Sequence, residues 1–215
     1  MKAEIYNIVS IAASIAYFIP ILLLAIKKMW KQTPLLLFSC YWLLTGIINI
    51  MDRVPGIPRE TLQMVTLVYN MFDIPIILFI LGIATQYSFI KTITKFAAPG
   101  LLAMQLLFFI VQGWQYEAAK YTLAIGLLIV LFVVLAEIAQ YMMKLEHSAS
   151  ENAMIYIYIA LLFAYGTFIV IYIFDYVIKV AGTDIDNFLI YYISSLIAII
   201  IASFAYMKHK ERKYI

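Results

Sequence analysis

Charged residues are scarce in this sequence, and cysteine is almost absent. Only 13% of the 215 residues are charged, whereas 66% are hydrophobic and the mean hydropathy is +0.97. Because soluble domains are about a quarter charged and about half apolar, no soluble domain fits this composition. The single cysteine, Cys40, excludes an intrachain disulfide and any zinc or iron–sulfur site built from several cysteines. The net charge of +3 is small and lies in the loops, so it does not indicate nucleic-acid binding.

Long apolar runs make up most of the chain. A window of about 19 residues finds seven of them, at 6–26, 34–51, 62–86, 95–112, 120–143, 153–178 and 187–206. A helix that crosses a bilayer needs about 20 mainly apolar residues. The runs are apolar on every side, which favours helices over the alternating strands of a barrel. The sequence therefore predicts an all-α polytopic membrane protein, a single domain over 1–215 with seven transmembrane helices.

The signals at two loop boundaries support this division. Ser148 followed by Glu151 has the pattern of a capping box before the sixth run, and Thr183 with Asp186 repeats a similar pattern before the seventh. Asp175, close to the outer end of the sixth run, is expected to reach water. These positions indicate where the sixth and seventh helices are separated from their neighbours.

The distribution of basic residues predicts the orientation in the membrane. Loops on one side contain Lys2, Arg53, Arg59, Lys120 and Lys179. Loops on the other side contain Lys27, Lys28, Lys31, Lys91, Lys95, Lys144, Lys208, Lys210, Arg212 and Lys213. Because cytoplasmic loops carry the excess of Lys and Arg, we expect the N-terminus outside and the C-terminus in the cytoplasm of a plasma (inner) membrane protein. The first run is expected to remain as an anchor, since no A-x-A site closes it.

Asp73 is the most unusual residue of the apolar runs. It lies about eleven residues, or 16 Å, from the start of the third run, and no Lys or Arg occurs in the middle of any run. An ionisable group there costs about 2.5–3.5 kcal/mol on insertion scales, so the neutral acid is expected unless water or a bound cation stabilises the charge. We predict a site for a proton or a small ligand at Asp73. The structural alternative is an acid that donates to a carbonyl freed by Pro75.

Other polar and aromatic residues share the expected depth or helix face of Asp73. The predicted ligand- or proton-binding set adds Thr66, Tyr69, Asn70, Trp42, Thr45, Tyr165, Tyr191, Ser194 and Ser195. Aromatic residues at helical spacing also occur as ordinary core, which is the competing interpretation. Glu137, about six residues from the inner end of the fifth run, is a secondary acid that either extends to the interface or is functional. No catalytic residue and no metal site are predicted.

The third run also resembles a stretch of the microbial rhodopsins. Residues 71–78 read Met-Phe-Asp-Ile-Pro-Ile-Ile-Leu, similar to the opsin segment in which an aromatic and small polar residues precede proline and leucines. The resemblance implies a seven-helix bundle with its N-terminus outside. The family attaches retinal to a lysine in the seventh helix, but residues 187–206 contain none. No covalent retinal and no other cofactor is therefore expected.

The sequence leaves two functions open, and a third is less favoured. The first is a non-enzymatic sensor or receptor-like protein with an opsin-like bundle that binds a small ligand or a proton around Asp73. The second is a small proton- or cation-coupled transporter. An integral-membrane enzyme is less favoured, because the sequence has no H-x-x-x-H pair and no G-x-S-x-G motif. The expected partners are the lipid bilayer and a small molecule or proton, without nucleic acid, and a homo-oligomer is the default assembly.

Overall fold

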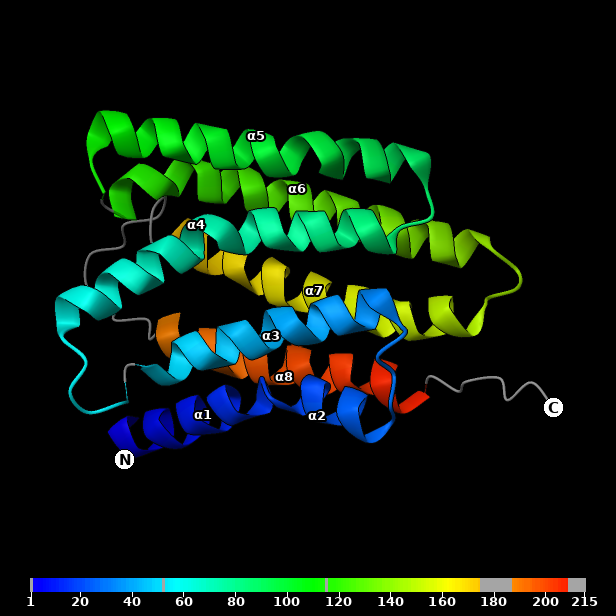
Figure 1. The fold of residues 1–215 in the computed structure, drawn as a ribbon, viewed down its shortest axis with the longest axis horizontal. Coiled ribbons are helices and arrows are strands. Elements are labelled where there is room, and N and C mark those ends of the chain that lie inside the picture. The colour runs from blue at the N-terminus through cyan, green and yellow to red at the C-terminus, as the bar shows by residue number, and fades with distance from the viewer. Residues whose placement is uncertain (1, 52, 115, 175–186, 209–215) are drawn as a thin grey trace.

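The computed structural model describes residues 2–51, 53–114, 116–174 and 187–208, where all regular structure is helical (Figure 1). The helices are α1 (Lys2–Ala16), α2 (Ile19–Ile26), α3 (Thr33–Met51), α4 (Arg59–Ala84), α5 (Ser88–Gln112), α6 (Tyr116–Met143), α7 (Ala149–Tyr172) and α8 (Asn187–Lys208). Helices α1 and α2 form one span together, so seven spans are long and apolar enough to cross a membrane. The predictions of an all-α fold and of seven transmembrane helices are confirmed. Asp175, Thr183 and Asp186 lie outside the described residues.

The first span is interrupted near its middle. Helix α1 ends at Ala16 and α2 begins at Ile19, with Pro20 in the first turn of α2. Pro20 has no N–H to donate to the carbonyl of Ala16, so the helical ladder cannot continue through this point. The interruption leaves the Tyr17 side chain buried between the helices.

The spans pack as a ring in chain order. Each span contacts the next along the chain, and α8 returns to contact α1 and α2. Helix α4 also contacts α6, and α5 packs against both of them along one edge of the bundle, opposite α1 and α2 (Figure 1). The order of packing is known from these contacts, whereas the N-outside orientation stays a prediction.

Three glycines allow close approach between helices: Gly82 of α4, which faces Thr94 of α5, and Gly46 and Gly126. A Cβ atom at Gly46 of α3 would lie 2.8 Å from the Cβ of Tyr17, and one at Gly126 of α6 would lie 2.7 Å from the Cδ1 of Ile74 in α4. Small residues at such contacts let helix backbones approach one another in membranes. The absence of a side chain at Gly46 and Gly126 therefore sets the spacing of α3 from the first span and of α6 from α4.

One part of the bundle is closely packed with aliphatic side chains. We call nine of these side chains, which come from α4, α6 and α7 and have exposed fractions of 0–2%, the apolar layer: Ile77, Leu78, Leu81, Val130, Val133, Val134, Ile157, Ala160 and Leu161. Beyond it, at the start of α7, the predicted capping box is confirmed. The Ser148 hydroxyl accepts from the Glu151 N–H at 3.2 Å, and the Glu151 carboxylate accepts from the Ser148 N–H at 2.9 Å.

Candidate ligand-binding cavity

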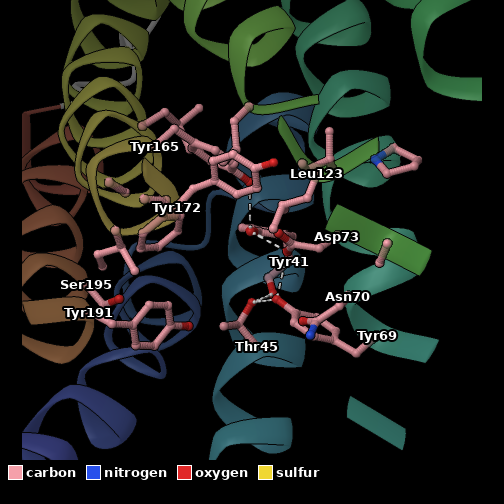
Figure 2. Close-up of a pocket in the computed structure, with 18 of the residues that line it drawn as sticks. Tyr41, Thr45, Tyr69, Asn70, Asp73, Leu123, Tyr165, Tyr172, Tyr191 and Ser195 are labelled. Atoms are coloured by element: carbon pink, nitrogen blue, oxygen red, sulfur yellow. Dashed lines mark hydrogen bonds between the residues drawn. The ribbon is translucent and has the colours of Figure 1, made fainter. Parts of the chain in front are cut away.

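A cavity of about 320 Å³ lies among the helices (Figure 2). Side chains from α3 to α8 line it, together with Tyr17 from the interruption of the first span. It extends from the apolar layer toward the end of the bundle where α4 and α6 begin, because its lining includes Asn70 and Lys120. Cavities of roughly 300–1,000 Å³ with mostly apolar walls and a few polar groups are typical of small-molecule sites.

Asp73 accepts hydrogen bonds from two tyrosines in this cavity. The hydroxyls of Tyr41 and Tyr69 each donate to Oδ1 of Asp73 at 2.8 Å, as Figure 2 shows. The Tyr41 hydroxyl also lies 3.2 Å from that of Tyr165, and the Tyr69 hydroxyl lies 2.7 Å from Oγ1 of Thr45. The network joins α3, α4 and α7, so the carboxyl group is held at the junction of three helices.

The second carboxyl oxygen of Asp73 faces different surroundings. Both tyrosines donate to Oδ1, and among the described residues no hydrogen bond reaches Oδ2. Asp73 is half-buried and lines the cavity. The carboxyl group therefore receives hydrogen bonds from tyrosines instead of donating to the backbone near Pro75.

A second polar group lies across the cavity on α8. Ser195 is 3% exposed and its hydroxyl has no hydrogen-bond partner among the described residues. Tyr17 and Ser195 lie beside the Tyr191 hydroxyl, and the Tyr191 ring stacks on Phe168 with centroids 5.1 Å apart. A buried polar atom without a partner in the protein is matched in most proteins by water or a ligand. Ser195 is thus a second polar group in the cavity wall, beside the Tyr191 hydroxyl.

The structure places most of the residues predicted from sequence around one cavity. Eight of the ten line it: Trp42, Thr45, Tyr69, Asn70, Asp73, Tyr165, Tyr191 and Ser195. Asn70 is exposed and lies at the rim, whereas Thr66 is half-buried and Ser194 is buried, and neither of them is part of the lining. Glu137 is buried elsewhere, beside a separate small cavity.

Sequence reasoning missed several lining residues. Tyr41 is the most important, and its position four residues before Thr45 on the same helix face could have revealed it. Gln105 is a 7% exposed amide in an apolar helix, a signal comparable to that of Asp73. Lys120, predicted as a loop residue, lines the same cavity as Asp73 from the start of α6. Tyr17, Phe168 and Tyr172 complete the aromatic part of the wall.

Neither metal chemistry nor a known relative identifies the site. Among residues 2–51, 53–114, 116–174 and 187–208, no three His, Cys, Asp or Glu side chains gather closely enough to hold a metal ion. The chain matches no protein-family model, no curated protein and no solved structure. The arrangement of side chains in the cavity is therefore the basis for the functional proposal.

Proposed function

We propose that this seven-span membrane protein is a non-enzymatic sensor or receptor-like protein that binds a small molecule in the cavity around Asp73. The observation that carries the proposal is the combination of the 320 Å³ cavity with two polar residues in its lining, Asp73 and Ser195. Each has an oxygen that makes no hydrogen bond to the described residues. If Asp73 only linked helices by hydrogen bonds, it would need neither a cavity beside it nor a carboxyl oxygen without a hydrogen bond.

The wall of the cavity favours a mostly apolar ligand with a hydrogen-bond donor or a positive charge. Aliphatic side chains such as Leu123, Leu127 and Leu161 cover much of the wall. The carboxyl oxygen accepts hydrogen bonds, and the lining includes Tyr41, Trp42 and Tyr165, whose side chains are of the aromatic type that attracts cations. A small amine with a hydrocarbon body has both properties.

A sensor must convert binding into a change of helix packing. A molecule in this cavity contacts six helices, including α4, α7 and α8, which are not all packed against each other. A bound molecule therefore favours the helix arrangement that it binds most tightly, as does any ligand with different affinities for two states.

The test begins with the purified protein and small probes. Compounds that copurify are identified by mass spectrometry, and binding of cyclohexylamine-type amines and of their neutral alcohol counterparts is followed by the fluorescence of Trp42. We expect saturable binding to the wild type and at least roughly tenfold weaker binding to Asp73→Asn, since a hydrogen bond to a charged group contributes about 1.5–3 kcal/mol.

A matched control separates the cavity from general charge effects. Glu60→Gln removes an acid from an exposed position in the first turn of the same helix and should leave binding unchanged. Trp42→Phe should remove the change in fluorescence on binding, while Trp30 and Trp114 still emit, and should not remove the copurified compound. Failure of every probe to bind, with no copurified molecule, would contradict the proposal.

A proton- or cation-coupled transporter is the second candidate, and one observation favours it. A second acid, the buried Glu137, lies on the other side of the apolar layer from Asp73. Two acids on opposite sides of a closed layer fit a route with access from alternate ends. Uptake of the amine probes into liposomes across a pH gradient should then occur and should lose its coupling in Asp73→Asn. Saturable binding without any flux would leave the sensor as the function.

A further inference from the structure

A buried carboxyl group lies outside the ligand cavity. Glu137 is 5% exposed on α6, six residues or about 9 Å before the helix ends at Met143. Its Oε1 has no hydrogen-bond partner among the described residues, although Thr85 and Tyr158 lie beside the carboxyl group. A buried oxygen without a partner is costly, and more so when the group is ionised. The Glu137 carboxyl group therefore requires a proton or a cation to neutralise it, or a water molecule to form a hydrogen bond with it.

A small cavity adjoins this carboxyl group. It measures about 40 Å³ and is lined by residues from the end of α4 and the turn that follows, from α6 and from the start of α7: Ala84, Gln86, Tyr87, Glu137, Tyr141, Ser150, Glu151, Met154 and Tyr158. A water molecule needs about 10–15 Å³ of such space and a few polar partners. The cavity has room and hydroxyl groups for water, but it is too small for the organic ligand proposed at Asp73.

Within the part of the chain that the structure describes, the charged and titratable groups around the cavity leave Glu137 without a cation. Lys144 donates to Glu151 and lies 5.9 Å from the ring centroid of Tyr87. Besides Glu137, the cavity is faced by Tyr87 from the turn after α4, Tyr141 from α6, and Glu151 and Tyr158 from α7, and the His147 ring stacks on Tyr141. The ammonium group that flanks the cavity is thus already bonded to the other glutamate. A proton is the simplest means of neutralising Glu137.

The apolar layer separates this carboxyl group from Asp73. Tyr165, in the network of Asp73, and Tyr158, beside Glu137, are seven residues or about 10 Å apart on α7. Between them lie the aliphatic side chains of the layer, with exposed fractions near zero. The cavity at Glu137 is instead lined by exposed residues at the bundle end, Gln86 and Ser150. Glu137 therefore has access to water from the end opposite to the Asp73 cavity.

We propose that Glu137 and the 40 Å³ cavity form a second site, which takes up and releases a proton through a bound water at the end of the bundle where α4 ends. A hydronium ion in the cavity transfers its proton to Oε1, which gives the neutral acid and a neutral water, and the reverse step returns the proton to the solvent. The site depends on no ligand at Asp73, so it stands independently of the sensor function.

Infrared spectroscopy of the protein in liposomes tests this proposal. The wild type should show the carbonyl band of a protonated carboxylic acid that disappears in one titration as the pH is raised, and that shifts rapidly on transfer to D₂O. Glu137→Gln should lack this band, and Asp73→Asn should retain it. Glu137→Met serves as a second variant, because it removes the carboxyl group without introducing a new polar side chain into the core.

Access through the cavity is tested by a pair of neighbouring substitutions. Ser150→Leu fills the polar wall of the cavity and should slow the D₂O shift several-fold, whereas Ala149→Leu, one residue away and outside the lining, should not. The proposal would be overturned if the difference spectrum between the wild type and Glu137→Gln contained no titrating carbonyl band. A carboxylate band of Glu137 that responds to exchange of Na⁺ for K⁺ but not to pH would also overturn it, since the site would then hold a metal cation.

Discussion

The two acids inside this bundle, the half-buried Asp73 and the buried Glu137, differ in what their surroundings supply. Asp73 accepts two hydrogen bonds from tyrosines and opens onto a cavity of about 320 Å³. Glu137 has an oxygen without a partner among the described residues and adjoins a cavity of about 40 Å³. One site has polar support and space for an organic molecule, and the other has room only for water. The residue type alone therefore does not determine the role of a carboxyl group in a membrane.

The largest difference between the two acids should be in their effect on stability. Asp73→Leu leaves the hydroxyls of Tyr41 and Tyr69 without their shared acceptor, and we expect it to lower the free energy of unfolding by about 1–3 kcal/mol. Glu137→Met removes a buried oxygen that has no partner, and we expect it to raise stability by about 1–3 kcal/mol.

Thermal unfolding in detergent, followed by circular dichroism, measures both changes. The two melting temperatures should move in opposite directions from that of the wild type. If both melting temperatures moved in the same direction, the two carboxyl groups would contribute to stability with the same sign. The contrast between the two sites would then be wrong.

A second contrast concerns the helices that form the walls of the large cavity. Gly46→Ala places a Cβ 2.8 Å from the Cβ of Tyr17, which lines the cavity, and should cost about 1–3 kcal/mol by overpacking. Gly166→Ala is the matched control on α7, because a Cβ there meets nothing within 4 Å. It should gain up to about 1 kcal/mol from helix propensity. Equal melting temperatures for the two variants would show that the first span can move away from α3 at little cost.

The fold was largely predictable, since it follows from composition and length. Seven apolar runs gave seven spans because a bilayer-spanning helix must satisfy its own backbone hydrogen bonds. The predicted capping box at Ser148 followed from local chemistry alone. The interruption between α1 and α2 was not predicted, although Pro20 marks it, because the run as a whole is apolar enough to read as one helix.

The site was predictable only in part, because a sequence gives the depth of a residue but not the rotation of its helix. Asp73 was identified from its expected cost, and its neighbours from spacing along one face. Thr66 shares that face but lies too far along α4 to reach the cavity. Tyr41 was missed because its contact with Asp73 joins residues 32 positions apart, which no local pattern reports.

A smaller effect is expected from removing one donor at Asp73. Tyr41→Phe deletes the hydroxyl that donates to Oδ1 and keeps the ring. The remaining donor, Tyr69, should hold the carboxyl group less firmly, so we expect amine affinity to fall by roughly 1 kcal/mol, about fivefold. Tyr121→Phe removes a hydroxyl from a 53% exposed tyrosine of α6 and serves as the control. A larger loss in Tyr121→Phe than in Tyr41→Phe, measured by fluorescence titration, would argue against Asp73 as the anchor.

The smallest effect on stability should come from the ion pair beside the Glu137 cavity. The hydrogen bond to Glu151 raises the pKa of Lys144 above its ordinary value of 10.5. Because the pKa is raised in the folded state, the stabilisation is present below the ordinary lysine pKa and is lost as the pH rises through the folded-state pKa. Lys144→Met should therefore lower the melting temperature slightly at neutral pH, and the gap should close at strongly alkaline pH.

The same variant also tests what the ion pair does for Glu137. Lys144 holds Glu151 at the wall of the small cavity, so its removal should let water reach Glu137 more freely. Faster D₂O exchange of the Glu137 carboxyl, together with a nearly unchanged melting temperature, would mean that the pair limits access to the acid and contributes little to the fold. A large fall in melting temperature with unchanged exchange would assign the pair to the fold, and the small cavity would then be open to water regardless of Lys144.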